Sequence, residues 1–206
     1  MKSIEEKILE RILRKGRGFV MTNRDFWDIA KPASVDWCLY RLKDRKVIRP
    51  VLRGIYDYPK FSELLQEEMA PDLAGVVQAI ARKNQWHIQI SGSAALNFLG
   101  LSTQIPMATV YYSDGPNRSF KVGNRILQFK HMLLKESKIA SPRSEMIVRA
   151  IGELGAEHTT PAVLEILKKQ TTPQERKKLL AETRFIRGWI REKIEHLCKE
   201  EETPHE

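Results

Sequence analysis

Residues 31–58, KPASVDWCLYRLKDRKVIRPVLRGIYDY, indicate the N-terminal architecture of this 206-residue chain. Apolar residues in this stretch recur at the i, i+3, i+4, i+7 spacing of a helix with one buried stripe. They are Val35, Cys38, Leu39 and Leu42. We therefore predict a helix that begins near Ala33 or Ser34. Its opposite face would carry polar, charged and unusually large aromatic side chains, namely Asp36, Trp37, Tyr40, Arg41, Lys43 and Asp44.

A β-hairpin is expected directly after this helix. Residues 47–51 and 55–58 are short strand-like runs, and residues 52–54 lie between them. Gly54 can take a positive φ in the turn, since it has no Cβ. Pro59 then ends the unit.

Two further helices are expected upstream. The first begins with the capping-box pattern of Ser3 and Glu6 and stops at Gly16. The second is brief, with Thr22 as its cap, and runs to about Ala30. Three helices followed by a two-stranded hairpin are the plan of a winged helix-turn-helix, whose third helix enters the major groove of DNA.

The rest of the chain predicts a mixed α/β domain with a helical C-terminal end. Residues 63–69 are read as a polar connection. The predicted strands are 86–90, 107–112, 119–122 and 125–131, and the predicted helices are 71–83, 94–99, 142–154, 161–169 and 173–198. The fold class is therefore α+β, with a winged helix-turn-helix domain at residues 1–60 and a mixed domain at residues 70–200.

Positive charge is concentrated in the N-terminal third. Residues 1–60 contain 15 Lys and Arg against 8 Asp and Glu, a net charge of +7, whereas the remaining residues contain 20 against 18, a net charge of +2. A basic segment attracts phosphate backbones through counterion release, although a solvated basic face is the alternative. We expect a double-stranded DNA operator as partner, with a homodimer on DNA, and candidate DNA-binding residues Thr22, Asn23, Arg24, Ser34, Trp37, Tyr40, Arg41, Lys43, Arg49 and Arg53.

These candidates have different expected roles. The helix carrying Trp37 would face the bases, Arg49 and Arg53 would grip backbone or minor groove from the hairpin, and residues 22–24 would hold phosphate through backbone amides and a guanidinium. Alternatives remain open for two of them, because Arg41 could pair with Asp44 or Asp36 and Trp37 could pack on the neighbouring domain.

Other classes of protein receive little support. No apolar run approaches the roughly 18 residues of a membrane span, and the N-terminus lacks the pattern of a signal peptide, so we expect a cytoplasmic protein without membrane contact. Cys38 and Cys198 have no CxxC partner, and the five histidines show no HxxxH-like spacing. We therefore expect structural thiols, no metal and no cofactor.

The order of several short segments resembles the antitoxins of bacterial AbiE-type, or type IV, toxin-antitoxin systems, in a branch previously catalogued only as a domain of unknown function. The segments are residues 18–26, 41–49, 53–56 and 59, then 90–95, 99–106, 112–116, 122–124 and 186–190. The resemblance implies a repressor of its own operon whose C-terminal part antagonises a nucleotidyltransferase toxin encoded beside it. An ordinary repressor whose C-terminal domain only oligomerises or senses an effector is the alternative.

An enzymatic function is a further alternative. Residues 90–93, Ile-Ser-Gly-Ser, resemble the Gly-Ser turn with which nucleotidyltransferases hold a triphosphate. Such enzymes need closely spaced carboxylates for two magnesium ions, yet Asp114 is the only acidic residue between Ser93 and Glu136. We therefore expect a tight strand-to-helix turn and no catalytic residues.

Overall fold

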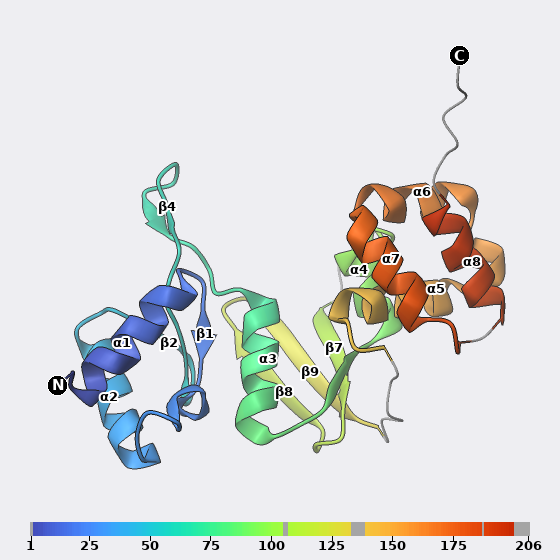
Figure 1. Ribbon diagram of the computed structural model, residues 1–206. Coiled ribbons are helices and arrows are strands. Elements are labelled where there is room, and N and C mark those ends of the chain that lie inside the picture. Colours follow the sequence, from blue (N-terminus) through green and yellow to red (C-terminus); the bar gives the residue numbers. More distant parts are fainter. Residues whose placement is uncertain (1, 105–106, 133–138, 187, 200–206) are drawn as a thin grey trace. The chain divides into compact units, whose positions relative to one another are not determined.

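The computed structural model describes residues 2–104, 107–132, 139–186 and 188–199. Ile105, Pro106 and Arg187, which belong to the resembling segments, lie outside the described residues. The chain divides into two compact units, Met1–His87 with Ser119–Leu127 and Ile88–Arg118 with Gln128–Glu206. The fold is α+β, as the sequence predicted, with an N-terminal winged helix-turn-helix, a central sheet and a helical C-terminal region (Figure 1).

The winged helix-turn-helix consists of α1 (Ile4–Lys15), β1 (Val20–Met21), the 3₁₀ helix η1 (Asn23–Phe26), α2 (Pro32–Asp44), β2 (Arg49–Leu52) and β3 (Ile55–Asp57). Its three strands lie in the order β1-β3-β2, and both pairs are antiparallel. The predicted second helix is shorter than expected. The backbone N–H groups of Ile29 and Ala30 both donate to the Phe26 carbonyl. The chain therefore turns after η1, and the helix does not extend to Ala30.

The helix ends follow from local chemistry. Ser3 and Glu6 form the predicted capping box, in which the Glu6 backbone N–H donates to Ser3 Oγ at 3.2 Å and the Ser3 N–H donates to Glu6 Oε2 at 2.7 Å. α2 starts at Pro32, one or two residues before the predicted position, because the first helical position needs no N–H donor. The hairpin turn forms at Gly54 with φ of +70°, as predicted.

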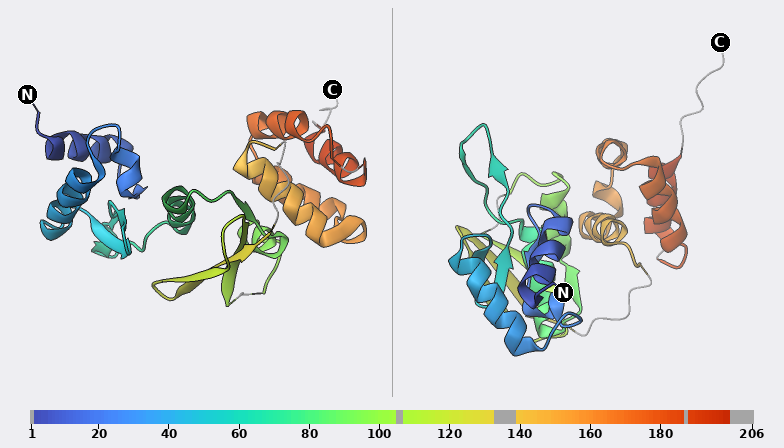
Figure 2. Two further views of the ribbon diagram at one scale, coloured as in Figure 1. Left: turned by 90° about the horizontal axis from the view of Figure 1, so that it is seen from below. Right: turned by 60° about the vertical axis from the view of Figure 1, so that its left-hand side comes forward.

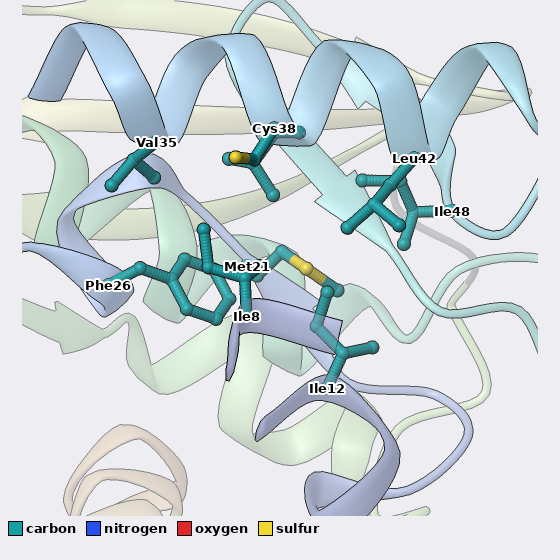
Figure 3. Packing of buried hydrophobic residues seen from close by; sticks show 9 residues of the cluster. Ile8, Ile12, Met21, Phe26, Val35, Cys38, Leu42 and Ile48 are labelled. Atoms are coloured by element: carbon teal, nitrogen blue, oxygen red, sulfur yellow. The ribbon is translucent and has the colours of Figure 1, made fainter. Parts of the chain in front are cut away.

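The core of this domain lies between α1 and α2, with Met21 and Phe26 filling the space between the two helices (Figure 3). The predicted apolar stripe of α2 is buried there. The cluster comprises Ile8, Ile12, Met21, Phe26, Val35, Cys38, Leu39, Leu42 and Ile48. Burial of this stripe fixes which face of α2 remains outside.

Helix α3 (Leu73–Asn84) belongs to the same unit. Asp72 caps it through the N–H groups of Ala74 and Gly75. Near its end, Arg82 Nε donates to Asp25 Oδ1 at 2.8 Å, and Arg82 Nη2 donates to the Val20 carbonyl at 3.1 Å. These bonds tie α3 to the helix-turn-helix.

The segment predicted as a plain connection at residues 63–69 belongs to a second hairpin. Its strands are β4 (Phe61–Ser62) and β5 (Glu67–Glu68), which pair antiparallel. We call residues 61–69 the arm. The arm was not predicted, because two-residue strands have no periodicity to detect.

The remaining strands are β6 (Ile88–Ile90), β7 (Ala108–Ser113), β8 (Arg118–Val122) and β9 (Arg125–His131), in the order β6-β7-β9-β8. The helices are α4 (Gly92–Phe98), α5 (Pro142–His158), α6 (Pro161–Lys169), α7 (Pro173–Glu182) and α8 (Gly188–Cys198). The single helix predicted over residues 173–198 is therefore wrong, since the chain breaks after Glu182, where Thr183 Oγ1 donates to the Leu179 carbonyl at 2.6 Å. The helices α5 to α8 are seen from two further sides in Figure 2. Among the described residues, no helix has both the length and the apolar character needed to cross a membrane.

Candidate nucleic-acid interface

The outer face of α2 carries an exposed aromatic pair. Trp37 and Tyr40 are 61% and 51% exposed, and their rings stack with centroids 5.9 Å apart and planes 14° apart. Lys43 Nζ lies 4.5 Å from the centroid of the Tyr40 ring. The three side chains thus form a continuous aromatic and cationic strip on one side of the helix, as the helical spacing predicted. Trp37 is exposed within this unit, where a flat ring can pack on a base edge or sugar.

A cluster of charges flanks the strip. The Glu5 carboxylate, on α1, pairs with Arg41 Nε at 3.1 Å and with Arg45 Nη1 at 2.7 Å. The predicted alternative partners of Arg41, Asp36 and Asp44, are therefore not the ones it uses. Both arginine side chains remain more than half exposed, so each keeps donors turned to solvent. Glu5 and Arg45 were missed by the sequence analysis, because the packing of α1 on α2 brings them together.

The turn before α2 is held by internal hydrogen bonds. Thr22 is fully buried, and its backbone N–H donates to Asp25 Oδ2 at 2.8 Å. This corrects the expectation that the Thr22 amide holds a phosphate, because that donor is already used. Asn23 Nδ2 likewise donates to Asp36 Oδ1 at 2.8 Å. Asn23 therefore fixes the start of α2, which carries the half-buried Ser34 in its first turn.

Arg24 makes a cation–π contact with a neighbouring aromatic ring. Its guanidinium lies 4.6 Å from the centroid of the Trp27 ring, and Trp27 is itself 43% exposed. This cation–π contact positions the charge at the surface without neutralising it. Trp27 was not among the sequence candidates, although it falls within the predicted second helix.

The turn of the β2–β3 hairpin presents Arg53 to solvent. Lys83 of α3 supports the turn by donating from Nζ to the Arg53 carbonyl. A Cβ at Gly54 would lie 2.9 Å from Lys83 Nζ, so both the positive φ and this neighbour favour glycine. Burial, and the nearby charge of Arg53, lower the pKa of Lys83. No local pattern in the sequence connects Lys83 to a turn 30 residues earlier.

Arg49 has a different role from the predicted one. Its Nε and Nη2 donate to Asp57 at 3.1 and 2.6 Å, and its other contacts are with Glu68 and the Met69 carbonyl. The Asp57 side chain is 2% exposed, and the hydrogen bond with it raises the pKa of the Arg49 guanidinium. These internal partners correct its assignment to the DNA backbone, and Arg49 joins the wing to the root of the arm.

The Ile90–Ser93 turn in the other unit is a helix start. Ser91 Oγ accepts the Ala94 N–H at 3.2 Å, and a Cβ at Gly92 would lie 2.4 Å from Glu153 Oε2. The glycine therefore allows α5 to pack on α4. Glu153 was not predicted beside this turn, because it lies beyond Glu136 in the sequence.

A second carboxyl group of α5, that of Glu145, is largely buried, which raises its pKa. Arg149, which is also on α5, donates a hydrogen bond to Gln89 of β6. In the part of the chain that the structure describes, no three His, Cys, Asp or Glu side chains are grouped to hold a metal.

Comparisons with known proteins identify a family and a similar solved structure. Residues 7–179 match the family described as "Family of unknown function (DUF6088)". Among solved structures, the chain is similar to that of the RV2827C protein from Mycobacterium tuberculosis, with 11% identity and a TM-score of 0.43. That similarity covers 96% of this chain and 77% of the other. No curated protein matches the chain.

Proposed function

The chain belongs to the DUF6088 family, whose function is unknown, and we propose that it is a transcriptional repressor that binds double-stranded DNA through its winged helix-turn-helix. The observation that carries this proposal is the outer face of α2. It exposes the stacked rings of Trp37 and Tyr40 beside Lys43, in the helix that this architecture places in the major groove.

The proposed contacts divide by chemistry. Ser34 and Trp37, near the start of α2, would face base edges, together with Tyr40. Four cationic side chains, Arg24, Arg41, Lys43 and Arg53, would contact phosphates, because charge-assisted hydrogen bonds to phosphate supply most of the affinity. Arg45 is added to this set, since it lies beside Arg41 and keeps its side chain 56% exposed.

The second part of the proposal is antitoxin activity against a nucleotidyltransferase-type toxin. It rests on the sequence resemblance to AbiE-type antitoxins and assigns the interaction with the toxin to the C-terminal part of the chain. The alternative is an ordinary repressor whose C-terminal part only oligomerises or senses an effector. Neither version includes a catalytic step, and assays for metal-dependent nuclease and nucleotidyl transfer test that exclusion.

Selection from a random duplex library tests DNA binding. We expect the purified protein to enrich one sequence and to shift it in a gel. Lys43→Ala and Arg53→Ala should weaken the complex, whereas Lys177→Ala, an exposed lysine on α7, should not. Failure of the native protein to bind selected or random duplex at about 50 mM salt, where phosphate contacts are strongest, would refute the proposal.

Co-expression tests the second part. The open reading frame next to the gene is expressed in a host cell with and without this chain. We expect growth arrest that this chain relieves, including when the Lys43→Ala substitution has weakened DNA binding. Arrest that is not relieved would favour the ordinary repressor.

A further inference from the structure

The arm exposes apolar side chains that the unit itself leaves uncovered. Leu64 and Leu65 at its tip are 92% and 64% exposed, and Phe61 and Met69 at its root are each about half exposed. In Figure 1 the arm, labelled β4, projects from the winged helix-turn-helix beyond the end of β2. Isolated two-stranded hairpins are marginally stable in water, and ordered apolar tips usually mark a contact surface.

Internal hydrogen bonds hold the arm together. Ser62 Oγ accepts the Leu65 N–H at 3.2 Å, and Gln66 Nε2 donates to the Glu63 carbonyl at 2.6 Å, which closes the tip. At the root, the Met69 N–H donates to the Lys60 carbonyl at 2.8 Å. A preformed tip loses little conformational entropy on binding, so its leucines are suited to insertion into another surface.

The charge of the arm indicates which surface. Residues 61–69 contain three glutamates and no lysine or arginine, although the first 60 residues carry a net charge of +7. An acidic arm is repelled by phosphate and attracted by a basic protein surface. The chain itself offers such a surface.

A hollow of about 420 Å³ lies beside the root of the arm, and it combines cationic with apolar walls. Arg17 and Lys46 supply the positive charge, and Val47, Tyr58 and Phe61 supply apolar surface. The Arg17 guanidinium is held over the Tyr58 ring at 5.0 Å and donates to the Pro59 carbonyl at 3.0 Å. Glu68 also lines the hollow, but its carboxylate is paired with Arg49 at 3.3 Å.

We propose that two copies of this chain exchange arms, each inserting Leu64 and Leu65 into the hollow of the other while Glu63 and Glu67 face Arg17 and Lys46. The arm and its receptor lie on the same chain, so one twofold axis satisfies both contacts and closes the dimer. This inference does not rest on the proposed function, because the exchange needs no DNA.

The first experiment measures mass by light scattering after size exclusion, without DNA. At roughly 100 μM, where an interface of micromolar affinity is saturated, we expect a dimer for the native chain. Leu64→Ser with Leu65→Ser should weaken self-association at least tenfold. Leu13→Ser, which removes an exposed leucine of α1, should leave the dimer unchanged. A monomeric native chain, or a dimer that persists in the arm variant, would overturn the proposal.

A charge exchange tests the reciprocal arrangement. Glu63→Lys with Glu67→Lys reverses the arm, and Arg17→Glu with Lys46→Glu reverses the receptor. Each variant alone should be monomeric, with a native circular dichroism spectrum as proof of folding. Mixing the two should restore a dimer, because each arm then meets an oppositely charged hollow. Two dimeric single variants, or a mixture that stays monomeric while both spectra are native, would refute the exchange.

Discussion

Two arginines of the wing should respond in opposite ways to replacement by alanine. Arg53 lies exposed at the hairpin turn, whereas the Arg49 guanidinium is paired with Asp57, whose side chain is 2% exposed. Removing one phosphate contact lowers the slope of log affinity against log salt by about 0.9. The ratio of native to Arg53→Ala affinity should therefore be about 3.5-fold smaller at 200 mM salt than at 50 mM salt.

Arg49→Ala should leave that slope unchanged and reduce stability instead. It leaves the Asp57 carboxylate buried without its partner, which costs about 3–5 kcal/mol of the free energy of unfolding. Replacing both residues, as Arg49→Met with Asp57→Leu, should recover most of that loss because no buried charge remains. Fluorescence anisotropy with labelled duplex measures the slopes, and urea unfolding measures the stabilities.

The result that would refute this reasoning is specific. If Arg49→Ala lowered the salt slope by about 0.9 while its unfolding midpoint in urea stayed native, Arg49 would be a phosphate contact. The internal assignment of its guanidinium would then be wrong. An unchanged slope for Arg53→Ala would remove Arg53 from the interface.

Three further predictions concern other parts of the chain. Replacing Trp37 and Tyr40 together by alanine should weaken binding of the selected duplex by about 1–3 kcal/mol. The salt slope should not change, since neither ring is charged. Gel shifts measure the loss of affinity, and a changed salt slope would contradict the prediction. Burial raises the pKa of Glu145, so the folded chain keeps the Glu145 carboxyl group protonated to a higher pH than the unfolded chain does. The stability that this group contributes therefore falls as pH rises above its unfolded pKa of about 4.3. Glu145→Gln should therefore gain stability over the native chain in urea titrations as pH rises toward neutral, and an equal difference at every pH would contradict this. Burial raises the pKa of Cys198 to about 11, so its thiolate population near pH 8 is roughly a hundredfold below that of an ordinary thiol. Cys198 should therefore react with a disulfide reagent far faster in urea than in the folded chain. Equal rates in the two states would contradict the burial.

The fold of the first unit was largely predictable because its signals are local. The stripe of Val35, Cys38, Leu39 and Leu42 fixes α2, and the capping box at Ser3 and the glycine at the wing turn need only a few neighbouring residues. The arm was missed because its strands are too short for a period. The break between α7 and α8 was missed because apolar residues continue at helical spacing on both sides of it, at Leu179 and at Ile190.

The candidate site was predictable only in part, for the same physical reason. Helical spacing assigned Trp37, Tyr40 and Lys43 to one face, and the structure places them there. Spacing cannot tell which polar groups find partners across the fold. Arg49 bonds to Asp57 and Thr22 bonds to Asp25 within the fold. Arg45 and Lys83 join the candidate interface because they contact Glu5 and the Arg53 carbonyl, which lie on other elements.

The hydrogen bond between Arg82 and Asp25 determines how far the chain can be truncated while α2 keeps its support. Asp25 accepts both the Thr22 amide and the Arg82 guanidinium, and Val20 packs against Gly75, so α3 completes the structure that presents α2. A fragment ending at Pro59 would expose these groups and lose the brace under Arg53. We therefore expect a fragment that keeps the proposed DNA binding to extend at least through Asn84, whereas grafting only the first 60 residues onto another protein should yield an unstable fusion.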